Sequence, residues 1–127
     1  LPDQLASLAA QYQAAGDTAI NLTVTGLPRP LSEQVTHVAY RTAQEGLTNA
    51  RKHAPGQPVT LGLGFEPGQV TVSVVNPLPS AGHTGPLAET GAGAGLTGLK
   101  ERAALAGGTL EAGPADGTWR IDLTIPA

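Results

Sequence analysis

Three side chains with chemically useful groups lie four residues apart in the stretch YRTAQEGLTNARKHA, residues 40–54. Glu45 supplies a carboxylate, Asn49 an amide and His53 an imidazole. Residues four apart stack on one face of a helix, so these groups would form one polar edge beside an apolar stripe. The alternative is an ordinary amphipathic helix whose polar edge happens to contain them.

Gly46 and Asn49 are unusual residues for the interior of such a helix. Both are poor helix formers, and glycine costs about 1 kcal/mol relative to alanine. We therefore expect something to approach the helix surface closely at this point. An amide oxygen with a nearby carboxylate suits Mg²⁺, a hard ion that retains waters and shares phosphate oxygens. Arg51 and Lys52 could reach those phosphates, or they could form a solvated edge.

A second candidate is GAGLTG, from Gly93 to Gly98, which has the spacing G-x-G-x-x-G. Its context does not fit a dinucleotide fingerprint, because a polar loop precedes it where a buried strand is required. Glycines that enter a helix nevertheless let backbone N–H groups approach an anion, and the helix N-terminus adds favourable partial charge. From these residues alone, a phosphate cradle and a flexible loop before an ordinary helix are equally open.

Periodicity predicts the elements that must position these groups. Helical spacing of apolar residues indicates three helices: residues 2–15, a long helix capped by Ser32 and stopped by Pro55 and Gly56, and residues 96–105. Alternating patterns indicate strands over residues 19–25, 58–65, 69–76, 107–111 and 118–125, with turns at 66–68 and 114–117. Residues 77–95 show no period and predict a long loop with a functional role. This order predicts an α+β domain, with a mixed sheet of about five strands and about three helices on one face.

The composition limits the class of protein. The 127 residues fit one domain, 1–127, and with 3% aromatic residues the core must be aliphatic. A net charge of −3 argues against a nucleic-acid-binding surface. The absence of cysteine excludes disulfides and zinc–thiolate sites. No segment resembles a signal peptide or a membrane span. Because the chain begins at Leu1 and contains no methionine, we expect it to be a fragment of a longer protein.

Two of these segments together resemble a known family. YRTAQEGLTNARKHA resembles the N-box of bacterial sensor histidine kinases, in the subclass whose response regulators carry a helix-turn-helix output domain. GAGAGLTGLKER, residues 91–102, resembles the second glycine box of that subclass, and the resemblance covers nearly the whole chain. It implies an ATP-binding catalytic domain of the GHKL superfamily. The implied fold is the Bergerat fold, a two-layer α/β sandwich shared with DNA gyrase and MutL.

The resemblance also implies roles for individual residues. Asn49 would bind Mg²⁺ through its side-chain oxygen, and Glu45 would lie near the metal waters and the γ-phosphate as a proton acceptor. Residues 77–92 would form the ATP lid. The residues implied to contact ATP or its Mg²⁺ are Asn49, Lys52, His53, Asn76, Gly93, Gly95, Leu96 and Gly98.

One segment departs from the family pattern. The family has an aspartate followed by glycines after the second hairpin strand, and this aspartate accepts a hydrogen bond from the adenine amino group. Here the matching segment is VVNPLPS, with Asn76 in place of the aspartate and with Pro77 and Pro79 in place of glycines. An asparagine can still accept from the amino group, and its NH₂ group can donate to the neighbouring ring nitrogen. Asn76 could instead be a simple turn residue at the end of a strand.

The resemblance also defines partners. The family carries its phosphoacceptor histidine on a separate helical hairpin, and His37, His53 and His83 lack that context. The chain would therefore donate the γ-phosphoryl group of ATP to a dimerisation and phosphoacceptor domain of the same protein, and would not autophosphorylate alone. A response regulator would be an indirect partner. The fragment would contact neither nucleic acid nor membrane, and would lie in the cytoplasm as part of a membrane-anchored sensor.

Two alternatives remain open. The first is a regulatory or binding module of the same fold with a degraded nucleotide site, which VVNPLPS favours and which Glu45, Asn49 and the glycine box oppose. The second is an anti-sigma-factor serine kinase, a free-standing domain of similar fold. The leading helix and the N-box wording favour the sensor kinase. No hydrolase motif is present.

Overall fold

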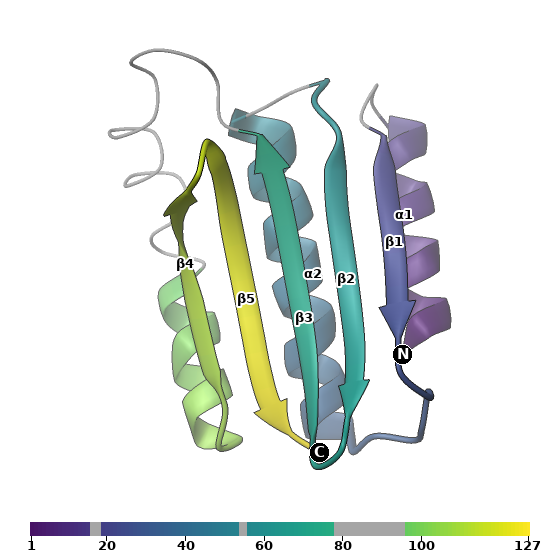
Figure 1. Cartoon of the computed structure of the whole chain (residues 1–127), viewed down its shortest axis with the longest axis vertical. Helices are drawn as coiled ribbons and strands as arrows, with labels where there is room; N and C mark the ends of the chain where they lie inside the picture. Colours follow the sequence, from purple (N-terminus) through teal and green to yellow (C-terminus); the bar gives the residue numbers. More distant parts are fainter. Residues whose placement is uncertain (16–18, 54–55, 78–95) are drawn as a thin grey trace.

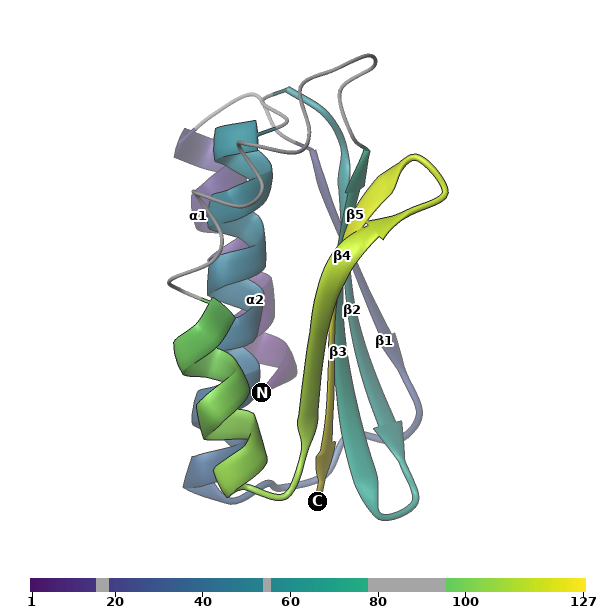
Figure 2. The same ribbon diagram turned by 90° about the vertical axis from the view of Figure 1, so that its left-hand side faces the viewer.

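The computed structural model describes residues 1–15, 19–53, 56–77 and 96–127, without the side chains of His53 and Ala115. The elements follow in the order α1 (Pro2–Ala15), β1 (Ile20–Thr25), α2 (Glu33–His53), β2 (Val59–Glu66), β3 (Gln69–Pro77), β4 (Thr109–Ala115) and β5 (Thr118–Pro126). Residues 96–105 form a further helix before β4, called here the helix 96–105. The predicted α+β class is confirmed: a sheet of five strands carries the helices on one face (Figures 1 and 2).

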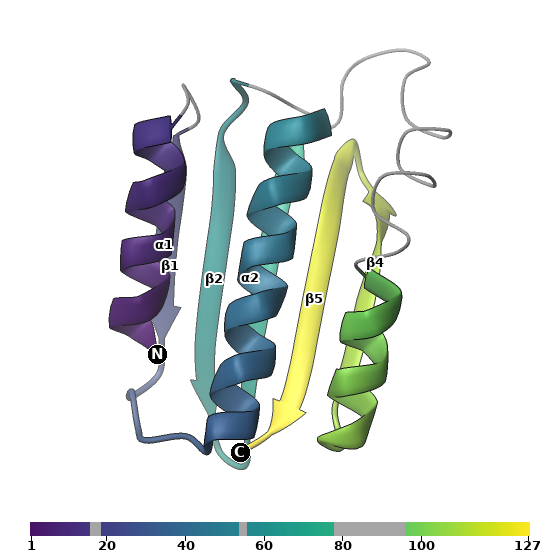
Figure 3. The ribbon, with the colours of Figure 1, turned by 180° about the vertical axis from the view of Figure 1, so that it is seen from behind.

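The sheet is mixed, as predicted, and has the strand order β1-β2-β3-β5-β4. The chain passes from β1 through α2 to β2, and β1 and β2 pair in parallel. The remaining neighbours pair antiparallel. Seen from behind, α1, α2 and the helix 96–105 lie side by side across the sheet (Figure 3). None of the described helices lies on the other face of the sheet (Figure 2).

The fourth strand differs from the prediction. It begins at Thr109 and continues to Ala115, whereas the predicted strand covered residues 107–111. Pro114 lies inside β4 and pairs with Trp119. A proline has no N–H to donate, and β4 tolerates it because an edge strand has a neighbouring strand on one side only. The connection to β5 is only Asp116 and Gly117, with φ values of 50° and 78°. Positive φ at both positions is typical of a tight two-residue hairpin, so the predicted turn over residues 114–117 is too long.

Local capping fixes the ends of two helices. Ser32 caps α2 as predicted: its Oγ accepts a hydrogen bond from the Val35 N–H at 3.2 Å. The helix 96–105 ends at Gly107, whose φ of 84° suits glycine. There the Gly108 N–H donates to the Ala103 carbonyl at 2.7 Å, as in a Schellman motif.

The core lies between the sheet and the helices and is aliphatic, as the composition predicts. Residues alternate along β3, so that Val70, Val72, Val74 and Asn76 are buried and the residues between them are half-buried. α2 packs over β3 and β5. This alternation turns the apolar side of β3 toward α2, and it places Asn76 on that same side.

Candidate functional site

Two buried asparagines have polar atoms without a partner. Asn49 in α2 is 2% exposed and Asn76 in β3 is 3% exposed. Among the described residues, neither amide atom of Asn49 has a hydrogen-bond partner, and the Oδ1 of Asn76 has none. A buried polar atom left unpaired costs about 1–3 kcal/mol. The buried Thr42 shows the contrast, because its hydroxyl donates to the Val38 carbonyl at 2.8 Å. The unpaired amide atoms indicate a place where a ligand supplies the missing partners.

The two asparagines lie at the same level in the space between the layers. Gly46 of α2 lies against Val74 of β3: a Cβ on Gly46 would come within 2.6 Å of Val74 Cγ2. From that contact both elements run toward the same end of the sheet (Figure 1). Asn49 follows Gly46 by three helix residues, about 4.5 Å along the axis, and Asn76 follows Val74 by two strand residues, about 6.6 Å. Both amides therefore lie just beyond the Gly46–Val74 contact.

The opposite side of α2 is occupied by α1. The hydroxyl groups of Tyr12 and Thr48 are 2.6 Å apart, which joins α1 to α2. The Arg51 guanidinium carbon lies 4.9 Å from the centroid of the Tyr12 ring, a cation–π contact. The structure thus places Arg51 at α1, on the side of α2 away from Asn49. The interpretation of Arg51 as a phosphate contact does not fit this arrangement.

Glu45 and Asn49 lie along one edge of α2, as the helical spacing predicts, and Lys52 continues this edge; the side chain of His53 is not described. Val38 belongs to the same edge, since positions 38, 42, 45, 49 and 52 repeat at intervals of three and four. Val38 lines a groove shared with the helix 96–105, so this edge of α2 is turned toward that helix. Glu45 is half-buried and lines a pocket of about 290 Å³ together with Tyr12 of α1, Thr48 of α2 and Leu99 of the helix 96–105. Lys52 is exposed.

The amide of Asn76 is oriented by its own strand end. Its Nδ2 donates a hydrogen bond to the Pro77 carbonyl at 3.1 Å. A carbonyl oxygen can only accept, so the nitrogen must point toward it. This leaves Oδ1 as the buried atom without a partner, and it can only accept. The site therefore offers one acceptor from β3 beside the unpaired amide of α2.

Several predicted site residues are not brought together by the described structure. Gly93 and Gly95, with most of the predicted lid, lie outside the described residues, and the side chain of His53 is not described. Leu96 is buried in the core at 7% exposure. Gly98 is half-buried, and a Cβ there would meet no described neighbour within 4 Å.

Gly46 has a structural explanation that the sequence analysis did not give. The sequence analysis expected something to approach the helix surface at Gly46, and the neighbour is the side chain of Val74 in β3. The glycine is therefore required by the packing of α2 on the sheet and does not by itself indicate a ligand. The indication of a ligand rests on the unpaired amide atoms of Asn49 and Asn76.

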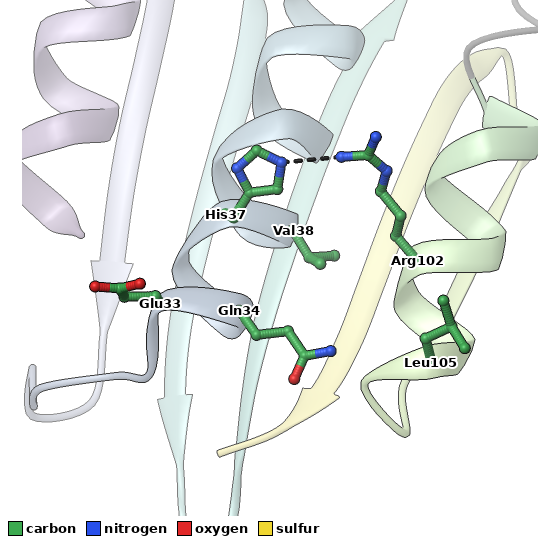
Figure 4. A pocket seen from close by; sticks show the side chains of 6 residues that line it. All are labelled: Glu33, Gln34, His37, Val38, Arg102 and Leu105. Atoms are coloured by element: carbon green, nitrogen blue, oxygen red, sulfur yellow. Dashed lines mark hydrogen bonds between the residues drawn. The ribbon is translucent and has the colours of Figure 1, made fainter.

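A groove of about 540 Å³ lies between the first turns of α2 and the last turns of the helix 96–105 (Figure 4). His37 is exposed and projects over it, with its Nε2 3.0 Å from Arg102 Nη1. Leu105 borders it and is 82% exposed. Because the groove is at the other end of α2 from Asn49, it does not take part in the site.

Other features of the surface add no further candidate. Arg120 and Asp122 form an ion pair at 3.2 Å on the face of the sheet without helices. The hydrogen bonds that Arg120 donates to the Asp122 carboxylate raise the pKa of Arg120. In the described ranges, no three His, Asp or Glu side chains are grouped so that they could hold a metal. None of the described helices is both long enough and apolar enough to cross a bilayer.

Comparison with solved structures shows the fold. The ThkA histidine kinase catalytic domain matches with a TM-score of 0.71 and 15% identity over 99% of this chain and 91% of its own. The mycobacterial sensor histidine kinase MprB matches with a TM-score of 0.68 and 21% identity over 98% and 92%. Full-length ShkA in complex with AMPPNP matches with a TM-score of 0.76 and 21% identity over 98% and 29%. No family model matches the chain.

A curated relative decides the family. Over 100 residues the chain is 35% identical to the signal transduction histidine-protein kinase/phosphatase UhpB of Salmonella typhimurium. The chain belongs to the histidine kinase catalytic domains. The match covers 76% of this histidine kinase domain, which spans only 18% of the length of UhpB.

Trp119 is a residue near the asparagines that the sequence analysis missed. It pairs with Asn76 in the sheet and lies on the same face. It is the single tryptophan of this histidine kinase domain. Its spacing in the sequence could have indicated that it faces the helices, because Trp119 alternates in phase with Ile121, Leu123 and Ile125, which face the core.

Proposed function

We propose that the domain binds ATP with Mg²⁺ between the C-terminal half of α2 and the end of β3, and presents the γ-phosphoryl group for transfer. The observation that carries this proposal is the pair of buried asparagines whose unpaired amide atoms lie at one level between the layers. A ligand that enters there supplies partners to both. ShkA, of similar fold, is described in complex with the ATP analogue AMPPNP, which supports this choice of ligand.

In this proposal Asn76 binds the adenine ring. Its Oδ1 is a buried acceptor without a partner, and the 6-amino group of adenine is a donor. One N–H of its NH₂ group already donates to the Pro77 carbonyl, whereas Oδ1 has no partner, so Oδ1 is the atom that we assign to the adenine amino group. Asn76 therefore accepts the hydrogen bond from the adenine amino group that the aspartate accepts in the family.

Asn49 and Glu45 serve the phosphate end. The Oδ1 of Asn49 is buried and unpaired, and an amide oxygen is the hard ligand that Mg²⁺ accepts while it keeps waters and phosphate oxygens. When bound, Mg²⁺ neutralises charge on the transferring phosphoryl group. Glu45, one turn earlier on the same edge, would accept a proton near the γ-phosphate. Lys52, His53 and the glycines Gly93, Gly95 and Gly98 remain proposed phosphate contacts, on the resemblance alone.

The partner of the reaction is a histidine outside this chain. We propose that it lies on a dimerisation and phosphoacceptor domain of the same protein, with a response regulator as the next acceptor. We place the domain in the cytoplasm, as part of a membrane-anchored sensor. The comparisons favour neither the degraded module nor the anti-sigma-factor kinase, since the relatives are histidine kinases.

Calorimetric titration of the chain with ATP, with and without Mg²⁺, tests this proposal. Asn49→Ala removes the proposed metal ligand, and Asn21→Ala is the matched control, because Asn21 is an exposed asparagine on β1. We expect binding that requires Mg²⁺ for full affinity, that falls by at least about tenfold in Asn49→Ala, and that is unchanged in Asn21→Ala. The unmodified chain, folded by circular dichroism but without binding at millimolar ATP, would contradict the proposal and favour the degraded module.

A further inference from the structure

Trp119 lies directly beside Asn76 in the sheet. The two residues are paired partners in the antiparallel register of β3 and β5. Side chains of directly paired residues share one face, with Cβ atoms about 4.5–5.5 Å apart. Asn76 points toward the helices, so Trp119 does too. The indole ring is therefore attached to β5, the strand next to β3, which carries the unpaired Oδ1 of Asn76.

Part of the indole ring is left uncovered. The other residues of its face, Ile121, Leu123 and Ile125, are at most 1% exposed, whereas Trp119 is half-buried. The difference follows from its place along the strand. Trp119 lies level with Asn76, past the contact that Gly46 of α2 makes with Val74. A partly exposed aromatic side chain thus lies beside a buried acceptor that has no partner among the described residues.

The edge of α2 that holds Asn49 is turned to the same space. α2 packs over β3 and β5, and its other side is occupied by Tyr12 of α1. Asn49 therefore lies between the same two layers as the side chains of Asn76 and Trp119. Binding sites for small molecules combine apolar and aromatic walls with a few polar groups of this kind.

We propose that Trp119 is the apolar floor of the base pocket and contacts the purine ring of the nucleotide whose 6-amino group donates to Asn76. This inference rests on the proposed function and adds a residue that binds the face of the base. Nucleobases gain affinity from aromatic side chains through their π-faces. Trp119 is thus a positioning residue for the base and takes no part in phosphoryl transfer.

The single tryptophan allows a direct test. Its fluorescence is recorded while the chain is titrated with MgATP, with adenosine and with inorganic triphosphate plus Mg²⁺, and binding is measured in parallel by calorimetry. We expect MgATP and adenosine to quench the emission, with a midpoint equal to the calorimetric Kd for MgATP. Inorganic triphosphate, which has no base, should leave the emission unchanged.

Variants complete the test. We expect Trp119→Leu to weaken MgATP binding by about tenfold, the order of an aromatic contact to a base, and Trp119→Phe to stay within about threefold. Thr124→Ala, on the same strand but on the other face, is the control and should bind normally.

Three results decide the outcome. Calorimetric binding of MgATP without any change in tryptophan emission would overturn the inference and leave the proposed function standing. Quenching of the tryptophan emission by inorganic triphosphate, which has no base, would also overturn the inference, because the change in fluorescence would then come from the phosphates. Absence of calorimetric binding would overturn the proposed function itself. If Trp119→Leu does not fold, the emission of the unmodified chain still decides.

Discussion

Gly46 of α2 lies directly against Val74 of β3, so close that a Cβ on the glycine would be 2.6–2.9 Å from three atoms of the valine side chain. This contact sets the distance between the helix layer and the sheet at the entrance to the site. Asn49 and Asn76 both lie just beyond this contact, between the helix layer and the sheet. The glycine that the sequence marks as costly for a helix thus positions the two amides.

Replacing Gly46 by alanine should destabilise the domain. The added methyl group must displace Val74 or α2, and such overpacking costs about 1–3 kcal/mol, more than the gain of up to about 1 kcal/mol in helix propensity. We expect a lower midpoint of urea denaturation in Gly46→Ala, and recovery when Val74→Ala is added. A double variant less stable than the sum of the single changes would contradict this explanation.

Gly98 provides the matched control for Gly46. A Cβ at this position in the helix 96–105 meets no described neighbour within 4 Å. Gly98→Ala should therefore raise the free energy of unfolding by about 0.5–1 kcal/mol through helix propensity. The same variant tests the proposed glycine box, because loss of ATP affinity without loss of stability would show a requirement imposed by the phosphates.

Replacing Asn49 by leucine should stabilise the nucleotide-free domain and abolish Mg²⁺-dependent binding. The leucine has the same branching and removes two buried atoms without partners, each of which costs about 1–3 kcal/mol when unpaired. We expect a higher midpoint of thermal denaturation without ATP, together with the loss of the shift that MgATP produces in the unmodified chain. Stability and function are then opposed at one residue.

Thr42→Val is the control for that substitution. Thr42 is also buried in α2, but its hydroxyl already donates to the Val38 carbonyl. Its replacement should change the stability little, because no unpaired atom is removed. If Thr42→Val and Asn49→Leu stabilise the domain equally, the unpaired amide is not the cause.

The sequence predicts most of the fold because its signals are local. Alternation along β3 and the Pro67–Gly68 turn depend on neighbouring residues, and both are found. The predicted extent of β4 was too short at its C-terminal end. The strand includes Pro114, which is tolerated there because β4 is an edge strand, and the sequence does not show which strand lies at the edge. Strand order is a property of the whole sheet, and no local pattern contains it.

The site was predicted unevenly for the same reason. Asn49 and Glu45 share an edge because helical spacing requires it. The role of Gly46 could not be predicted, since Val74 reaches it only through tertiary packing. The orientation of the Asn76 amide is set by its hydrogen bond to the Pro77 carbonyl, which only the structure reveals. The pairing of Trp119 with Asn76 depends on the register between two strands separated by more than 40 residues.

The domain should discriminate between adenine and hypoxanthine nucleotides. ITP carries a carbonyl in place of the 6-amino group, and this acceptor would face the acceptor Oδ1 of Asn76. We expect ATP to bind more tightly than ITP by about tenfold or more, since a site built for a hydrogen bond rejects an analogue that cannot form it. Calorimetry of both nucleotides measures the ratio. In Asn76→Ala the preference should nearly vanish, and equal affinities in the unmodified chain would contradict this role of Asn76.

The asparagine side chains themselves provide the most direct measurement. The sequence contains three asparagines, so a chain labelled with ¹⁵N-asparagine gives three side-chain NH₂ signals in a heteronuclear NMR spectrum. Asn49 and Asn76 are buried at the proposed site, and Asn21 is exposed on the edge strand β1. On titration with MgATP we predict that the signals of Asn49 and Asn76 shift together and saturate at one Kd, while that of Asn21 stays in place. Saturating MgATP that leaves the signals of both buried asparagines unmoved would contradict the assignment of the nucleotide site.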